Sequence, residues 1–209
     1  MIRYKLFLNF AKEEAWLSAM ACQGWELSEI RLGGYHFRPA APQDARIRID
    51  FRTFATADEF ANYVTLFADS GWQHLAGTRS SGAQYFRRTA PDSSADIFSD
   101  ALSRAERYRR MARMWLALAV SLMILVTAVA ATGAMDVRAM IEPRRFYLTP
   151  GLWERQGEAF WQAFWFETPF ALFRAVLMYA LPVSLSLYLA SALHASRLYR
   201  KEKNDLVEA

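Results

Sequence analysis

Few residues whose side chains commonly carry out catalysis lie near one another in this sequence. The chain has three histidines, His36, His74 and His194, and a single cysteine, Cys22. No cysteine and histidine have the spacing of a zinc site, and no HExxH, GxSxG or glycine-rich phosphate loop is present. We therefore expect no enzyme activity, no metal and no cofactor. Cys22 is expected to be a thiol packed in the core, and a reactive role is the alternative.

Two pairs of neighbouring acidic residues would suit general acid–base chemistry, but their positions favour a structural role. Glu13 and Glu14 stand near the start of a predicted helix, where a negative charge suits the positive end of the helix dipole. Thr56 and Glu59 have the spacing of a capping box at the start of a second helix. That motif accounts for the second acidic pair, Asp58 and Glu59.

Aromatic side chains are the main candidates for a binding site in the first 89 residues. One interpretation is that they pack in the core. The other is that some of them line a groove between two copies of a repeated segment, with arginines as polar anchors, because small-molecule sites are mainly apolar with a few placed polar groups. The candidate ligand-binding residues are Trp16, Trp25, Tyr35, Phe37, Arg38, Tyr63, Trp72, Tyr85 and Arg87.

The segment that carries these rings occurs twice. The stretches QGWELSEIRLGGYHFR, residues 23–38, and SGWQHLAGTRSSGAQYFR, residues 70–87, both open with a Gly-Trp pair and close on an aromatic residue followed by Arg. Gly24 and Gly71 stand where a helical pattern stops, a place that favours the left-handed conformation. Trp25 and Trp72 then begin the next strand, and we expect each ring to close one end of a core.

Each copy has the pattern of a strand, a helix and two further strands. Apolar residues alternate with polar ones at Ile47, Ile49 and Phe51, which is typical of a half-buried strand. One such copy has too little core to be stable alone. We predict an α+β fold in which two strand-helix-strand-strand repeats form a cytoplasmic sandwich domain over residues 1–89, with both helices on one face.

Two long uncharged stretches follow this domain. Residues 114–135 carry no charged side chain, and at roughly 1.5 Å per residue a helix of that length crosses a ~30 Å apolar layer. The second uncharged stretch, residues 175–193, contains Pro182, and the predicted span, residues 171–193, also includes Arg174 near its start. Arg174 either reaches back to the interface or forms a buried charge in a pathway. The sequence thus predicts a two-helix transmembrane hairpin, with a helix buried in a soluble protein as the alternative for the first stretch.

Basic residues on both sides of the spans predict the orientation. Residues 90–113 form a linker that is polar at its start and helical from about Ile97, and the tail of residues 194–209 is also basic. Both termini are therefore expected in the cytoplasm. The linker arginines are Arg104, Arg107, Arg109, Arg110 and Arg113. We interpret them as a topology signal with anionic-lipid contact, and expect no direct nucleic-acid binding, because the net charge is only +4.

The loop between the spans, residues 136–169, is expected outside the cytoplasm. Its stretch TPGLWERQGEAFWQAFWFETPF has aromatic residues at near-helical spacing, and Thr149 followed by Pro150 is a good helix start. The sequence predicts an amphipathic helix in the headgroup zone, and an aromatic ligand box is the alternative.

Several landmarks occur in an order that resembles a known family. The stretch YKLFLNFAKEEAWLSAMACQGWELSEIRLGGYHFR, then RIDFRTF and a later GWQH and QYFRR, cover about residues 3–88 and resemble the bacterial family called domain of unknown function 2812. The resemblance implies a multi-pass protein of a bacterial cell membrane, because members often carry spans after this domain. It also implies a regulatory role, since members are often encoded near PadR-type transcriptional repressors. It transfers no catalytic residue.

From these observations we expect a membrane-anchored cytoplasmic sensor or regulatory module. It would bind a small molecule or a partner protein, either in the membrane or a PadR-type transcriptional regulator, in addition to the lipid bilayer. The alternative is a structural or accessory subunit of a membrane complex.

Overall fold

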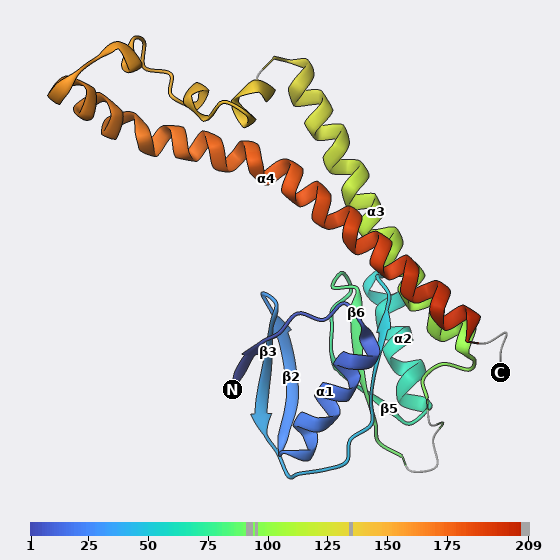
Figure 1. The fold of residues 1–209 in the computed structure, drawn as a ribbon. Coiled ribbons are helices and arrows are strands. Elements are labelled where there is room, and N and C mark those ends of the chain that lie inside the picture. The colour runs from blue at the N-terminus through green and yellow to red at the C-terminus, as the bar shows by residue number, and fades with distance from the viewer. Residues whose placement is uncertain (91–93, 95, 134–135, 206–209) are drawn as a thin grey trace. The chain divides into compact units, whose positions relative to one another are not determined.

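The computed structural model of the chain describes residues 1–90, 94, 96–133 and 136–205, and these form two compact units (Figure 1). Unit 1 consists of Met1–Met114 together with the chain from Ser191 on, and unit 2 consists of Trp115–Ala190. Two long helices have residues in both units.

Unit 1 contains two halves with the same order of elements. The first half comprises β1 (Ile2–Tyr4), α1 (Phe10–Cys22), β2 (Trp25–Arg31) and β3 (Gly34–Pro39), with an antiparallel sheet in the order β1-β3-β2. The second half comprises β4 (Ile47–Phe51), α2 (Ala57–Asp69), β5 (Trp72–Ala76) and β6 (Ala83–Arg88), with an antiparallel sheet in the order β4-β6-β5. The α+β class and the strand-helix-strand-strand order of each half are therefore confirmed.

The structure contains the predicted capping box and the predicted left-handed glycines at the helix ends. The Thr56 side chain accepts from the Glu59 amide while the Glu59 side chain accepts from the Thr56 amide, so the capping box is present. Gly24 and Gly71 have φ values of 81° and 79°, in the left-handed region that favours glycine. Trp72 is 1% exposed and packs in the core of the second half, as expected. Trp25 is only half-buried.

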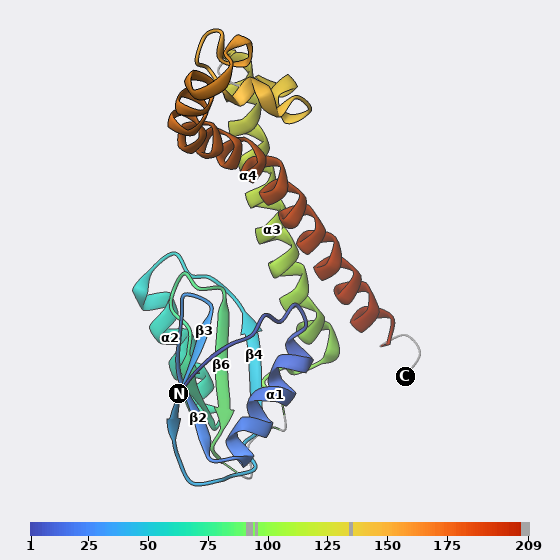
Figure 2. The ribbon, with the colours of Figure 1, turned by 60° about the vertical axis from the view of Figure 1, so that its left-hand side comes forward.

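The two helices of unit 1 lie on opposite faces of the β4-β6-β5 sheet, which corrects the expectation that they share one face (Figure 2). Phe86 of β6 packs against Tyr63 and Phe67 of α2. The adjacent Tyr85 donates its hydroxyl to Glu13 of α1. Since successive side chains of a strand point to opposite faces, α1 and α2 cover different sides of this sheet. The central strand β6 is thus buried on both faces.

Two helices are long and apolar enough to cross a membrane, as in a membrane protein. They are α3 (Ala101–Ala131) and α4 (Gly157–Asn204). α3 begins four residues later than the predicted start near Ile97, and Ile97 itself packs against the core of the second half. It ends at Ala131, and residues 134–135, the end of the predicted first span, lie outside the described part of the chain.

The segment between α3 and α4 differs from the prediction. It contains three short 3-10 turns, Val137–Met140, Pro143–Phe146 and Leu152–Glu154. No helix starts at Thr149 and Pro150; the aromatic residues from Phe160 on instead belong to α4, which runs on through the second span. The Thr149 hydroxyl donates to Glu167 of α4 rather than capping a helix of its own.

Arg174 is neither a free end group nor an unpaired buried charge. Its Nη1 lies 2.8 Å from Glu167 Oε1 and 2.5 Å from the carbonyl oxygen of Phe146, and its side chain is 36% exposed. The ion pair neutralises the charge within unit 2, so Arg174 fixes the preceding 3-10 turn against α4.

Candidate functional site

The first part of α3 lies along the free edge of the β4-β6-β5 sheet. β4 is an edge strand, and the Arg107 guanidinium donates from Nη1 to the carbonyl oxygen of Ile49 at 2.8 Å. Arg110 donates from Nε to the carbonyl oxygen of Phe51. Two residues along a strand rise roughly 6.6 Å and three along a helix roughly 4.5 Å, a mismatch that long arginine side chains accommodate. The arginines thus satisfy backbone groups that an edge strand leaves unpaired.

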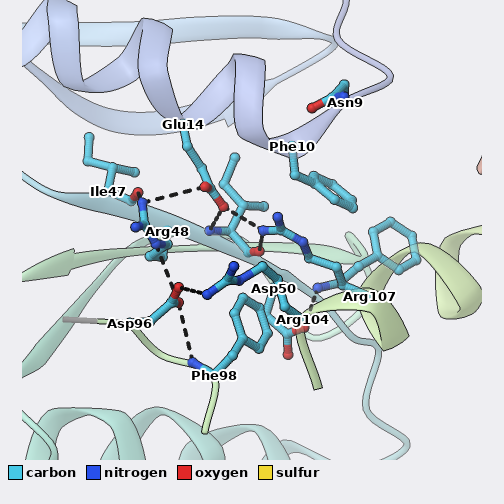
Figure 3. A network of polar contacts seen from close by, with 12 residues as sticks. Asn9, Phe10, Glu14, Ile47, Arg48, Asp50, Asp96, Phe98, Arg104 and Arg107 are labelled. Carbon is cyan, nitrogen blue, oxygen red and sulfur yellow. Dashed lines mark hydrogen bonds and ion pairs between the residues drawn. The ribbon is translucent and has the colours of Figure 1, made fainter. Parts of the chain in front are cut away.

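Glu14 of α1 completes the cover of this edge (Figure 3). Its Oε1 accepts from the Ile49 amide at 3.0 Å and from Arg107 Nη1 at 2.5 Å, while Oε2 lies 3.5 Å from Arg48 Nη1. The Arg107 side chain is only 2% exposed and the Glu14 side chain 9%. A buried ionic contact therefore joins α1, β4 and α3, and both backbone groups of Ile49 depend on it.

Aromatic rings surround the same guanidinium. The Arg107 carbon Cζ lies 5.1 Å from the ring centre of Phe10 and 5.2 Å from that of Phe98. The neighbouring Tyr108 accepts from the Phe10 amide at 3.2 Å through its hydroxyl, at the start of α1. These contacts help to bury the ion pair, and burial makes the loss of either partner more costly.

Asp50 connects α3 to the other face of the sheet. It is 5% exposed, accepts from the Tyr63 hydroxyl of α2 at 2.9 Å, and forms an ion pair with Arg110 of α3. Burial, followed by the charge of Asp50, raises the pKa of Tyr63, so this hydroxyl stays a donor. Asp50 alternates with the apolar residues of β4 and therefore points to the opposite face, where side chains of α2 and α3 cover it.

A polar cavity of about 380 Å³ lies beside the Glu14–Arg107 pair. Asp96, just before α3, pairs there with Arg104 at 2.7 Å and with Arg48 at 3.3 Å (Figure 3). Glu202, near the end of α4, lies 3.7 Å from Arg107 Nη2. The cavity therefore holds three arginines and three carboxylates, and their charges balance.

The contact between Arg107 and Glu202 is incompletely satisfied. Arg107 Nε and Glu202 Oε2 are both buried and have no hydrogen-bond partner among the described residues. Burial raises the pKa of Glu202, and Arg107 opposes that rise. The end of α4 is therefore held less firmly than the start of α3.

A second buried carboxylate, Glu13, lies between the two halves of unit 1. It is 4% exposed, and its Oε1 accepts from the hydroxyls of Tyr35 in β3 and Tyr85 in β6, both at 2.7 Å. Burial raises the pKa of Glu13, and the two tyrosine hydrogen bonds offset part of that rise. Each half supplies one tyrosine, so the carboxyl joins the halves at their centre.

Comparison with family models places this arrangement in a known group. Residues 9–120, more than half of the chain, match the model described as Protein of unknown function (DUF2812). The chain belongs to the DUF2812 family. The matched segment includes both acidic residues of α1 and the arginines of α3, so it extends beyond the residues 3–88 that carried the resemblance. Searches of curated proteins and of solved structures found no match.

The predicted ligand-binding residues do not form one groove in this DUF2812 chain. Trp16, Tyr35 and Phe37 form one ring cluster, with Trp16 centred 4.9 Å from Tyr35 and 5.6 Å from Phe37. Tyr63 and Trp72 belong to a different cluster, under α2. These rings are largely core residues, as the first of the two interpretations held. Their role in binding stays a prediction.

The two predicted arginine anchors meet at a carboxylate instead of facing a cavity. Arg38 Nε lies 2.7 Å from Glu26 Oε2, and Arg87 forms an ion pair with the other oxygen of Glu26. The pair of arginines lowers the pKa of Glu26, led by the Arg38 hydrogen bond. Arg38 comes from the first half and Arg87 from the second, so Glu26 is another link between the halves.

Of the predicted set, Tyr85 lies at a pocket between the halves. This seam pocket has a volume of about 530 Å³, lies between β2 and β5, and is lined by Ser28–Arg31, His74–Thr78, Ser81, Ala83 and Tyr85. Both strands carry an irregularity there, between Leu27 and Glu29 and between His74 and Ala76. Such bulges bend strand edges, and here they flank the pocket.

The burial of two charged residues of α1 was not predicted from the sequence. Glu13 lies in the first turn of α1, as predicted, but Asn9 supplies the cap, and the carboxylates of Glu13 and Glu14 are both buried, which was not predicted. A signal was available: the buried positions of α1 follow the spacing of one helix face, and both glutamates fall on it. The buried positions are Phe10, Glu13, Glu14, Leu17, Met20 and Ala21.

Two other expectations concern reactive or basic side chains. Cys22 is exposed at the end of α1 and is not a packed core thiol. Arg104, Arg107 and Arg110 form ion pairs within unit 1, which the sequence did not predict, and contact of the linker arginines with anionic lipid stays a prediction. Among the described residues no group of three metal-ligating side chains comes together.

Proposed function

We propose that this chain is a membrane-anchored regulatory module in which the α+β domain and the start of α3 change conformation together. The observation that carries the proposal is the buried Glu14–Arg107 pair, which joins α1 and the edge of β4 to α3. The same α3 backbone continues from the arginines into an apolar stretch long enough to cross a membrane.

The linkage supports regulation better than simple tethering. A tether needs only a flexible connection, whereas here three arginines of α3 are ordered against carboxylates of unit 1. Removing one partner of a buried ion pair costs several kcal/mol, so the domain and the helix cannot separate freely. A ligand or partner that binds one arrangement of the two halves better than another would therefore bias α3 as well.

The orientation and the partner complete the proposal. The basic segments beside both spans favour a cytoplasmic location for both termini, in a bacterial membrane. The partner that binds α3 and responds to its conformation is a membrane protein or a PadR-type repressor, as the family resemblance implies.

The proposal is tested by complementing a deletion strain with the wild-type chain, with Arg107→Met and with Arg109→Met. Arg109 is the matched control, because its guanidinium pairs with Glu106 one turn earlier and is 45% exposed. A regulatory module predicts that Arg107→Met, although inserted in the membrane, gives the same change in transcript profile as the deletion. An unchanged profile in the deletion strain, with loss of a stoichiometric membrane complex on native gels, would instead favour the accessory-subunit alternative.

A further inference from the structure

Glu13 is a buried carboxylate without a positive partner. No lysine, arginine or histidine of the described residues lies within ion-pair distance of it, and the nearby Arg107 is bonded to Glu14. Two tyrosine hydroxyls are its partners. A desolvated carboxylate held by neutral donors keeps a negative potential around it, and that potential favours a cation.

The aromatic cluster that includes Tyr35 already carries a cation, the ammonium group of Lys5. The Tyr35 ring that bonds to Glu13 packs against Trp16 and Phe7. The Lys5 ammonium lies 4.9 Å from the ring centre of Phe7 and 5.2 Å from that of Trp16. Aromatic faces bind ammonium groups in this way, because the ring face is negative.

The seam pocket is linked to Glu13 through one wall residue, Tyr85. Tyr85 forms part of its wall and donates its hydroxyl to Glu13, which makes the ring more electron-rich. The charges of Glu29 and Arg31, both on the pocket lining from β2, offset each other. Burial lowers the pKa of His74, so this residue is neutral near pH 7. The lining itself is thus close to neutral, and the carboxylate of Glu13, one hydrogen bond behind the Tyr85 ring, is the charge that would favour a cation there.

The size and lining of the pocket define the class of ligand. A volume of about 530 Å³ lies in the range of roughly 300–1,000 Å³ for small-molecule sites. Ile30, Leu75 and Ala76 supply apolar wall, and Ser28 and Thr78 supply polar groups. We propose that the seam pocket binds a small organic cation with an aromatic or apolar body, placed on the Tyr85 ring and attracted by Glu13.

This assignment rests on the proposed function and names its ligand class. Because the pocket lies between β2 of one half and β5 of the other, an occupant would contact both halves at once. Glu13 and Glu14 are consecutive residues of α1, so a displacement of Glu13 also displaces the residue that contacts Arg107.

The test uses the full-length chain in lipid nanodiscs and two water-soluble probes of similar size and opposite charge. Benzyltrimethylammonium is the cation, benzenesulfonate is the anion, and binding is followed by isothermal titration calorimetry against empty nanodiscs. We expect saturable binding of one cation per chain and no saturable binding of the anion. Absence of saturable cation binding, or binding of the anion as tight as that of the cation, overturns the proposal.

Variants locate the binding in the pocket. Glu13→Gln keeps the shape and removes the charge, so it should weaken cation binding by about tenfold or more. Glu158→Gln, in α4, makes the same chemical change outside unit 1 and should have no effect. Ser28→Phe fills the pocket from an exposed position and should abolish binding. If Glu13→Gln does not fold, Ser28→Phe tests the location of the site by itself. A folded Ser28→Phe protein that binds the cation with wild-type affinity would show that the cation does not bind in the seam pocket.

Failure of this inference can be told apart from failure of the proposed function. If no cation binds but Arg107→Met still gives the regulatory phenotype of the deletion, only the ligand class is wrong. If the cation binds and Arg107→Met leaves the regulated output intact, the binding site is supported and the proposed coupling to α3 is wrong.

Discussion

Replacing Arg107 by methionine tests whether α3 and the sheet edge form one cooperative structure. Methionine keeps much of the length of the side chain and its contact with Phe10, but removes the charge and the donors. Glu14 would remain buried with the Ile49 amide and the more distant Arg48 as partners, and the Ile49 carbonyl would lose its donor. Breaking one partner of a buried ion pair typically costs about 3–5 kcal/mol.

Hydrogen exchange of the full chain in nanodiscs measures this effect where it arises. The amides of β4 report the free energy of opening of the sheet edge, and those of α3 before Met114 report the helix. A loss of about 3–5 kcal/mol raises the exchange rate roughly a hundredfold to a few thousandfold, since each 1.4 kcal/mol is a factor of ten. The two segments should lose protection together.

The matched control is Arg109→Met on the same helix. Arg109 is 45% exposed, and an exposed pair such as Arg109–Glu106 contributes about 0–1 kcal/mol. A double variant in which Glu14 is also replaced by leucine should be less destabilised than the sum of the two single changes, because no unpaired charge remains. If Arg107→Met behaves like Arg109→Met, or if α3 opens while β4 keeps its protection, then α3 and the sheet edge do not form one cooperative structure.

Three further outcomes follow from the structure. Burial raises the folded pKa of Glu13, so stability from this group is greatest below the ordinary value of 4.5 and falls as the pH rises through the raised pKa. Glu13→Gln removes that loss. The unfolding temperature of the variant minus that of the wild type should therefore increase as the pH rises from 4.5 to about 8, and a difference that does not change with pH would contradict the raised pKa of Glu13. Gly24→Ala should cost about 1–2 kcal/mol for its positive φ, and more than Gly33→Ala, because a Cβ at Gly24 would lie 3.0 Å from the Ala40 carbonyl whereas none would be met at Gly33; equal unfolding temperatures would count against the close approach. If both termini are cytoplasmic, a membrane-impermeant maleimide should label Leu148→Cys in intact cells of a Cys22→Ser strain, but the exposed native Cys22 only after permeabilisation; labelling of Cys22 in intact cells would reverse the orientation.

Several parts of this fold were predictable because their signals are local. The capping box depends on residues three positions apart, and the Gly-Trp pairs on the conformation of a single residue at a helix end. The alternation in β4 and the two uncharged stretches likewise depend on neighbours along the chain. Such signals specify the elements, their order and the membrane-spanning character of α3 and α4.

The location of the site could not be predicted from the sequence, because it depends on contacts between residues that are far apart along the chain. Glu14 and Arg107 are separated by 93 positions, and Tyr85 and Glu13 by 72. Periodicity places each charged residue on a helix face, but burial of that face depends on which element packs against it. Without that contact, a glutamate on α1 and an arginine on α3 both look like solvated surface residues.

The sequence by itself determined the strand-helix-strand-strand order of both halves, the left-handed glycines at two helix ends, and two helices apolar enough to span a membrane. Only the tertiary structure decided that Glu13 and Glu14 are buried, that α3 covers the edge of β4, and that a pocket lies between β2 and β5. The physical reason is the distance along the chain over which each interaction acts. Backbone conformation responds to neighbours within one or two turns, whereas the burial of a charge is set by partners that folding brings together from distant parts of the chain.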